Sequence, residues 1–105
     1  MHIERQVHNS QLLLILSGTL DQSSVAMLAQ VMRGISSPNK VILDFGNIAA
    51  ISPRATQGLL SLSTECRQRE LQLVLCKLQR RVAEDLRPSG LLSLLPVYCT
   101  RGEAL

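Results

Sequence analysis

Four side chains of the types that serve as general acids and bases lie near the ends of expected strands: His2, His8, Asp21 and Asp44. Histidine titrates near neutral pH and is the side chain most often used as a general base. However, neither histidine has a cysteine or a second histidine at the spacing of zinc ligands. Aspartate at the end of a strand usually caps a helix or forms a turn. We therefore expect structural or solvent-facing roles for all four.

The sequence lacks the short motifs that bind nucleotides or perform hydrolysis. The patterns GxGxxG, GxxxxGK[ST], GxSxG and HExxH are all missing. The three cysteines, Cys66, Cys76 and Cys99, form no CxxC pair, and their odd number does not fit a closed disulfide framework. We predict a protein that is not an enzyme, that keeps its cysteines reduced, and that uses neither a metal nor a cofactor.

The net charge of +3 arises from eleven basic and eight acidic residues scattered along the chain. The densest basic stretch, residues 77–87, is interrupted by Glu84 and Asp85, and the only aromatic residues are Phe45 and Tyr98. Proteins that bind nucleic acid without a sequence motif combine a basic groove with stacking aromatic rings. The sequence therefore does not favour a nucleic-acid partner.

Length and hydropathy indicate one domain, because 105 residues, of which 46% are hydrophobic, suffice for one aliphatic core. The longest uninterrupted aliphatic run, residues 12–16, is far shorter than the ~20 residues that a membrane helix needs. The N-terminus also lacks the basic-then-apolar order of a secretion signal. We expect a single domain over residues 1–105 that is cytoplasmic and not inserted in a membrane.

The first half of the chain reads as a hairpin, a helix and a strand. A strand over residues 3–7 turns at Asn9 and Ser10 into a second strand over residues 11–17, which Gly18 ends. An amphipathic helix with Asp21 or Ser23 as its cap follows and stops before Ser36. A short apolar strand then covers residues 40–45.

The next helix has the clearest local signals in the sequence. Ser52 suits the N-cap, and Pro53 suits the first helical position, where its missing N–H would have no partner in any case. The apolar positions that follow have helical spacing: Ala55, Leu59, Leu62 and Cys66. Glycine within a helix costs about 1 kcal/mol relative to alanine, so we expect Gly58 to allow a close approach between this helix and the sheet.

The remaining segments complete an alternation of strands and helices. We expect a strand over residues 72–76, a shorter helix marked by Leu78, Val82 and Leu86, a strand over residues 94–98 and a terminal helix over residues 101–105. Pro88, Ser89 and Gly90 should end the shorter helix. Strands alternating with helices after a hairpin predict an α/β fold with a mixed sheet and helices on at least one face.

The order of these segments resembles a STAS domain, the fold of bacterial anti-sigma factor antagonists and of the cytosolic tails of sulphate-transporter-type anion carriers. The segments that carry the resemblance are LILSGTLD at residues 14–21, VILDFGNI at 41–48, SGL at 89–91, LPVY at 95–98 and TRGEAL at 100–105. The resemblance covers nearly the whole chain. It implies a STAS-like mixed β-sheet of four to five strands with about four helices packed on it.

The resemblance also implies a protein-binding module without catalytic activity. In the antagonists, the loop after the central strand carries D-S-[ST]-G, whose second residue is phosphorylated by a partner kinase. An alignment without gaps places Ser52 on the aspartate, Pro53 on the phosphoacceptor, Arg54 on the following residue and Ala55 on the glycine. Proline cannot be phosphorylated. Ser52 is then the candidate regulatory phosphosite, with capping as the favoured interpretation, and Ser23 or Ser24 could carry a regulatory hydroxyl instead.

We therefore expect partner binding through two short segments, with these candidate residues: Asp21, Gln22, Ser23, Ser52, Pro53, Arg54 and Thr56. The expected partner is an anti-sigma factor or a kinase-like ATPase. A cation at a helix start opposes the helix dipole, so Arg54 is either solvated or contacts an acidic partner surface.

Three other interpretations stay open. The domain could be a subunit or tail of a transport system, either an anion carrier or a lipid-transport ABC complex, with a transporter component as its partner. Nucleotide binding ranks last, because no glycine-rich phosphate cradle is present. A homodimer is also compatible with the sequence.

Overall fold

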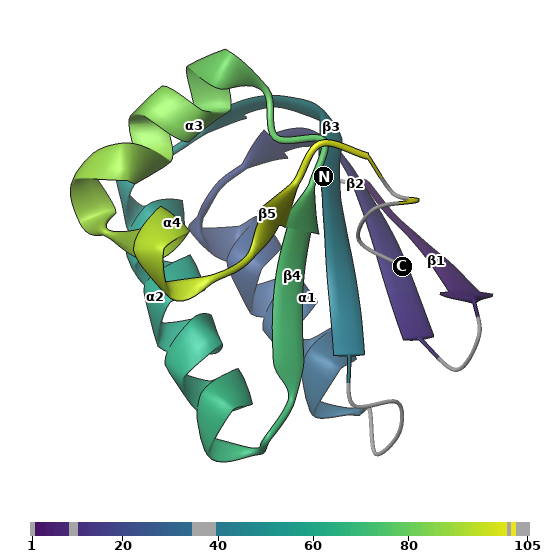
Figure 1. The fold of residues 1–105 in the computed structure, drawn as a ribbon. Coiled ribbons are helices and arrows are strands. Elements are labelled where there is room, and N and C mark those ends of the chain that lie inside the picture. The colour runs from purple at the N-terminus through teal and green to yellow at the C-terminus, as the bar shows by residue number, and fades with distance from the viewer. Residues whose placement is uncertain (1, 9–10, 35–39, 101, 103–105) are drawn as a thin grey trace.

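A computed structural model describes residues 2–8, 11–34, 40–100 and 102 (Figure 1). The strands are β1 (His2–His8), β2 (Gln11–Leu20), β3 (Lys40–Ile51), β4 (Gln72–Cys76) and β5 (Val97–Tyr98). The helices are α1 (Gln22–Arg33), α2 (Pro53–Gln68), α3 (Arg80–Leu86) and α4 (Leu91–Leu94), with a 3-10 turn, η1 (Arg87–Ser89), between the last two. The expected turn at Asn9 and Ser10 lies outside the described residues, as does the expected helix over residues 101–105 apart from Gly102.

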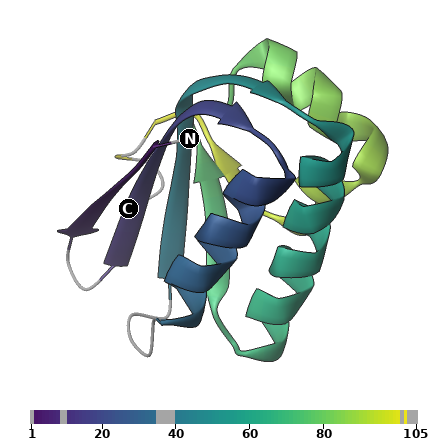
Figure 2. The same ribbon diagram turned by 180° about the vertical axis from the view of Figure 1, so that it is seen from behind.

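The five strands form one mixed sheet in the order β1-β2-β3-β4-β5. β1 and β2 pair antiparallel as the predicted hairpin, and all later neighbours pair parallel. Figure 2 shows α1 and α2 side by side against one face of this sheet. The α/β fold with a mixed sheet, predicted from the alternation of elements, is confirmed.

Two strands run further than the sequence predicted. β2 continues past Ser17 to Leu20, and β3 continues past Phe45 to Ile51. Gly18, with φ of 100°, does not end β2 but lies at an irregularity in the β2–β3 register, as expected of a glycine in a bulge. The extensions carry Leu20 and Ile51 into the core, so the predicted ends of the two strands, at Gly18 and at residue 45, were wrong.

The segment after α3 also departs from the prediction. A strand was expected over residues 94–98, but Leu91–Leu94 forms α4 and only Val97–Tyr98 pairs with β4. Gly90 has φ of 79°, in the left-handed region that glycine adopts without strain. This residue redirects the chain after η1 so that Leu91 is fully buried. The leucine-rich residues 91–95 are compatible with either a helix or a strand. The turn at Gly90 favours the helix.

The core lies mainly between the sheet and the helices. Alternation along β2 directs Leu12, Leu14 and Leu16 into this main core, and Leu13 and Ile15 into a smaller cluster on the opposite face. The buried stripe of α2 is the one expected: Ala55, Leu59, Leu62 and Cys66. Among the described helices, none has the length and apolar character needed to cross a bilayer.

Candidate functional site

The two segments predicted to bind a partner meet at one edge of the sheet. β2 and β3 are neighbouring parallel strands whose last residues, Leu20 and Ile51, pair in register. The Ser52 N–H donates a hydrogen bond to the Leu20 carbonyl over 2.9 Å. Because each strand leads directly into a helix, this pairing sets the starts of α1 and α2 beside each other.

Asp21 caps α1, which resolves the choice left open between Asp21 and Ser23. Its Oδ1 accepts hydrogen bonds from the backbone N–H and from the hydroxyl of Ser24, both over 2.8 Å. Both hydrogen bonds favour the ionised carboxylate and hold the pKa of Asp21 below its ordinary value of 3.8. The bond from the Ser24 backbone N–H has the larger effect. Ser24 is buried, whereas Asp21, Gln22 and Ser23 are exposed.

Ser52 caps α2, as predicted, and Pro53 is the first helical residue. The Ser52 hydroxyl accepts a hydrogen bond from the Ala55 N–H over 3.1 Å. Thr56 is only 6% exposed, and its hydroxyl donates to the Ser52 carbonyl over 3.2 Å. Of the candidate residues in this segment, Pro53 and Arg54 are therefore the exposed ones, Ser52 is half-buried and Thr56 lies beneath them.

Gly58 allows a close approach, but to another helix and not to the sheet as predicted. A Cβ added at this position would lie 2.8 Å from Cγ1 of Val25 in α1. Val25 is buried and branched at Cβ, so it has little freedom to move aside. The missing side chain at Gly58 therefore sets how closely the first halves of α1 and α2 pack.

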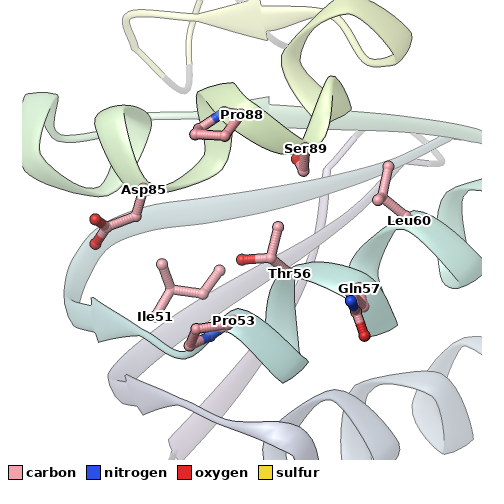
Figure 3. Close-up of a pocket in the computed structure, with 8 residues that line it drawn as sticks. All are labelled: Ile51, Pro53, Thr56, Gln57, Leu60, Asp85, Pro88 and Ser89. Atoms are coloured by element: carbon pink, nitrogen blue, oxygen red, sulfur yellow. The ribbon is translucent and has the colours of Figure 1, made fainter.

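Two hollows flank the start of α2. One is a groove of about 320 Å³ between α1 and α2, lined by Gln22, Val25, Arg54, Gln57, Gly58 and Ser61. The other, drawn in Figure 3, is a pocket of about 510 Å³ between α2 and the α3–η1 segment, lined by Ile51, Pro53, Thr56, Gln57, Leu60, Asp85, Pro88 and Ser89. We call them the groove and the pocket. The local sequence pattern predicts Arg54 at a binding surface but does not indicate the pocket, because Asp85 and Pro88 reach it only through tertiary packing.

The other residues considered for catalysis or metal binding are not brought together into a site within the described parts of the chain. Asp44 is buried and its Oδ1 accepts a hydrogen bond from the Gly46 N–H over 2.8 Å. Both residues lie inside β3, so the prediction that Asp44 forms a turn at the end of a strand was wrong. His2 is exposed on the edge strand. Cys66 and Cys76 are buried and Cys99 is exposed. Within the described parts of the chain, no three histidine, cysteine or acidic side chains gather in a group that could hold a metal ion.

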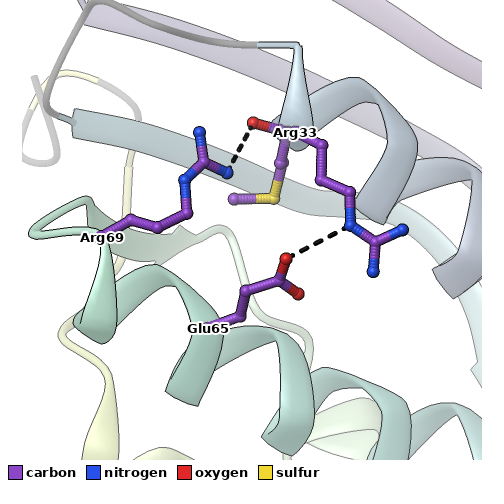
Figure 4. A network of polar contacts seen from close by, with 4 residues as sticks. Arg33, Glu65 and Arg69 are labelled. Carbon is purple, nitrogen blue, oxygen red and sulfur yellow. Dashed lines mark hydrogen bonds and ion pairs between the residues drawn. The ribbon is translucent and has the colours of Figure 1, made fainter.

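The C-terminal end of the helix pair contains direct polar links between α1 and α2 (Figure 4). Nε of Arg33 lies 3.2 Å from Oε1 of Glu65, and Nη1 of Arg69 donates to the Met32 carbonyl over 3.1 Å. Met32 itself is fully buried. This end is far from the capped helix starts, because α1 and α2 run side by side from those starts (Figure 2).

Comparison with known proteins identifies the family. Residues 2–104 match the STAS domain. The "Putative anti-sigma factor antagonist BtrV" of Bordetella bronchiseptica is 34% identical over 88 residues, which make up 84% of this chain and 73% of that protein.

Solved structures share the fold at lower identity. A sulfate transporter family protein from Wolinella succinogenes has a TM-score of 0.84 at 20% identity and covers 95% of this chain and 85% of its own. A "putative anti-sigma factor antagonist" from Thermotoga maritima has a TM-score of 0.82 at 14% identity, covering 97% of this chain and 90% of its own. The family match and the five-stranded sheet agree with the resemblance found in the sequence: the chain belongs to the STAS domain family.

Proposed function

We propose that this STAS protein is a non-catalytic regulatory module of the anti-sigma factor antagonist type, which binds an anti-sigma factor or a kinase-like ATPase. The observation that carries the proposal is the hydrogen bond from Ser52 to Leu20, which joins the two predicted binding segments into one surface. The sequence likeness to BtrV supports the antagonist class. We further propose that the domain extends over residues 1–105.

The proposed binding surface consists of Asp21, Gln22 and Ser23 at the start of α1, together with Ser52, Pro53 and Arg54 at the start of α2. Both helix starts are fixed by side-chain caps, so little backbone ordering is needed when a partner binds. Arg54 projects from this surface into solvent. Arginine is an effective interface anchor because its guanidinium binds carboxylates in a fixed geometry, and we propose an acidic group of the partner as its contact.

The proposed module works without the usual phosphoswitch. Pro53 occupies the position of the family's phosphoacceptor and has no hydroxyl. The neighbouring Ser52 hydroxyl already serves the Ala55 N–H as its cap, and phosphorylation there would have to replace that bond. We therefore propose that association is constitutive or is controlled on the partner's side.

A docking role in a transport system is the alternative. Its support is the likeness to the Wolinella structure, which at 20% identity concerns the fold alone. The relative at 34% identity belongs by its name to the antagonist class, so we rank the antagonist role first.

Affinity capture from a lysate of the source organism, with mass spectrometry, tests the proposal. The bait is compared with an Arg54→Glu variant and with Arg67→Glu, a matched control that reverses an exposed arginine at the other end of α2. Capture of an anti-sigma factor or kinase-like ATPase that Arg54→Glu loses and Arg67→Glu keeps would support both function and surface. Transporter components would favour the alternative, and equal loss in both variants would contradict the proposed surface.

A further inference from the structure

The start of α2 is a ridge between two hollows of opposite charge. Among the described residues, Arg54 is the one ionisable side chain that lines the groove on its α1 side, and Asp85 is the one that lines the pocket on its α3 side. Gln57 lines both. A partner seated on this ridge, as the proposed function requires, therefore meets a cation on one side and an anion on the other.

The polar groups of the pocket are unequal in what they offer a ligand. The Thr56 hydroxyl donates to the Ser52 carbonyl. The Ser89 hydroxyl donates to the Leu86 carbonyl over 2.6 Å and accepts from the Leu91 N–H over 3.1 Å. The protons of both hydroxyls are thus committed within the protein, and among the described lining side chains Asp85 and Gln57 are the polar ones without a hydrogen bond.

Asp85 is an exposed residue of α3, and its carboxylate lies at the rim of the pocket near Ile51 and Pro53 (Figure 3). Within the described residues it has no ion pair or hydrogen bond. The adjacent acid on α3 differs, because Glu84 pairs with Arg80 over 3.3 Å. A free carboxylate beside an apolar wall suits a cation on a long aliphatic stem.

We propose that the pocket receives an arginine side chain of the protein partner, together with a neighbouring apolar side chain. The arginine stem packs on Ile51, Pro53 and Pro88, and its guanidinium pairs with Asp85. A pocket of about 510 Å³ is larger than one side chain requires, and Leu60 provides an apolar wall for the second. This inference rests on the proposed function and adds the partner's charge order: an acidic group at the groove and an arginine at the pocket.

The charge pattern argues for a protein segment as the occupant. Asp85 lies within residues 77–87, the densest basic stretch of the sequence, so an arginine that enters here is positioned by this one carboxylate, which has no ion pair among the described residues. Such local complementarity selects partners and their orientation more than it adds affinity. Four of the eight lining residues are exposed, so the hollow is open enough for a side chain that enters from another protein.

A defined probe tests the pocket without the partner. The isotope-labelled full chain is titrated by NMR with a capped Leu-Arg dipeptide and, separately, with a capped Leu-Glu dipeptide. We expect the Leu-Arg peptide to shift the amide signals of Ile51, Thr56 and Ser89, and the Leu-Glu peptide to shift them less. In Asp85→Asn the Leu-Arg dissociation constant should rise about two- to fivefold, as expected for an exposed charge pair.

Glu84→Gln is the matched control, because it removes the neighbouring carboxylate that Arg80 already pairs. It should leave the Leu-Arg titration unchanged. Equal shifts with both peptides, equal weakening in both variants, or shifts centred elsewhere on the molecule would overturn the proposal. A small molecule co-purifying in the pocket and displaced by neither peptide would overturn it too.

The same substitution in the capture experiment separates this inference from the proposed function. If Arg54→Glu loses an anti-sigma factor that Asp85→Asn and Asp85→Arg both keep, the function stands and the arginine pocket is rejected. If the dipeptide binds as expected but the captured proteins are transporter components, the pocket stands and the proposed function is rejected.

Discussion

The two ends of the α1–α2 pair are built in opposite ways. At the C-terminal end, Arg33 pairs with Glu65 and Arg69 donates to the Met32 carbonyl, so charged side chains of one helix are bound to the other (Figure 4). At the N-terminal end, each helix is capped by its own preceding residue, Asp21 or Ser52. Among the described residues no ion pair links the two helix starts.

This difference indicates which end is free to act on another molecule. Arg33 and Glu65 pair with each other at the C-terminal end, whereas Arg54 at the N-terminal end, which we call the open end, and Asp85 of the neighbouring α3 are exposed and have no ion pair among the described residues. A protein that positions uncompensated charges on rigid elements departs from the arrangement best for stability alone, and such departures concentrate at functional surfaces. The C-terminal end should therefore carry stability, and the N-terminal end binding.

The largest expected effect is a loss of stability on removing the buried side chain at the C-terminal end of the α1–α2 pair. Met32 is fully buried beneath the links between the helices, so Met32→Ala should lower the free energy of unfolding by about 2–5 kcal/mol, the range for deleting a large aliphatic side chain from a core. Urea unfolding followed by circular dichroism measures this loss. Under native conditions the Leu-Arg titration of the pocket should remain unchanged.

Met27→Ala is the control for this substitution, because Met27 lies in the same helix and is 47% exposed. It should change stability by less than about 0.5 kcal/mol. If Met32→Ala abolished dipeptide binding in a variant that is still folded, the separation of the two ends would be refuted.

The next effect concerns the contact between the helices near the open end. In Gly58→Ala the new Cβ would lie 2.8 Å from Val25 Cγ1, and overpacking of this kind typically costs about 1–3 kcal/mol. The gain in helix propensity of about 1 kcal/mol offsets part of that cost. We expect a net destabilisation of about 1 kcal/mol in urea, since the strain term is the larger one.

Gly34→Ala provides the comparison, because a Cβ there would meet the Val31 carbonyl oxygen at an ordinary 3.6 Å. This variant should be neutral or slightly more stable. A Gly58→Ala protein more stable than the native chain would show that the helices are not held close by the glycine.

Features set by residues close together in the sequence were predicted, whereas features set by contacts between distant segments were not. The caps at Ser52 and Asp21 depend on residues within a few positions along the chain; the sequence predicted the first and narrowed the second to Asp21 or Ser23. The buried stripe of α2 was equally local. The extension of β3 to Ile51 was missed, because the strand is continued by pairing with β2 and by Gln79, whose Nε2 donates to the Gly46 and Ile48 carbonyls.

The candidate site divides in the same way. Arg54 follows a cap and a proline and was assigned to the surface from its sequence context. The pocket required α3 and η1 to pack beside α2, and in the sequence Asp85 appears only as an interruption of a basic stretch. Thr56 has helical spacing from Ser52, but only the structure shows that it is buried. Gly58 was assigned a close contact correctly, with the wrong element as its partner.

A smaller effect is expected from the ion pair itself. Arg33→Ala removes the link to Glu65, but the two side chains are 62% and 37% exposed, and exposed pairs contribute only about 0.2–1 kcal/mol. We expect a loss within that range, decreasing as salt is added. Urea midpoints at low and high salt measure it, with Arg67→Ala as the control for removing an exposed arginine. A loss as large as that of Met32→Ala would mean that charge, and not packing, stabilises this end.

The smallest effect is a dependence on acidic pH at the start of α1. The pKa of Asp21 is lowered in the folded protein, chiefly by the Ser24 N–H, so the ionised carboxylate stabilises the fold above the ordinary value of 3.8. This contribution decreases as the pH falls below 3.8 and is lost once the pH passes through the lower folded pKa.

The Ser24 amide signal should report that titration by NMR, with a midpoint below 3.8. Asp21→Asn keeps an N-cap of similar quality without a titrating group, so this transition should vanish from its Ser24 signal. A midpoint at or above 3.8 in the native chain would contradict the cap geometry at the open end.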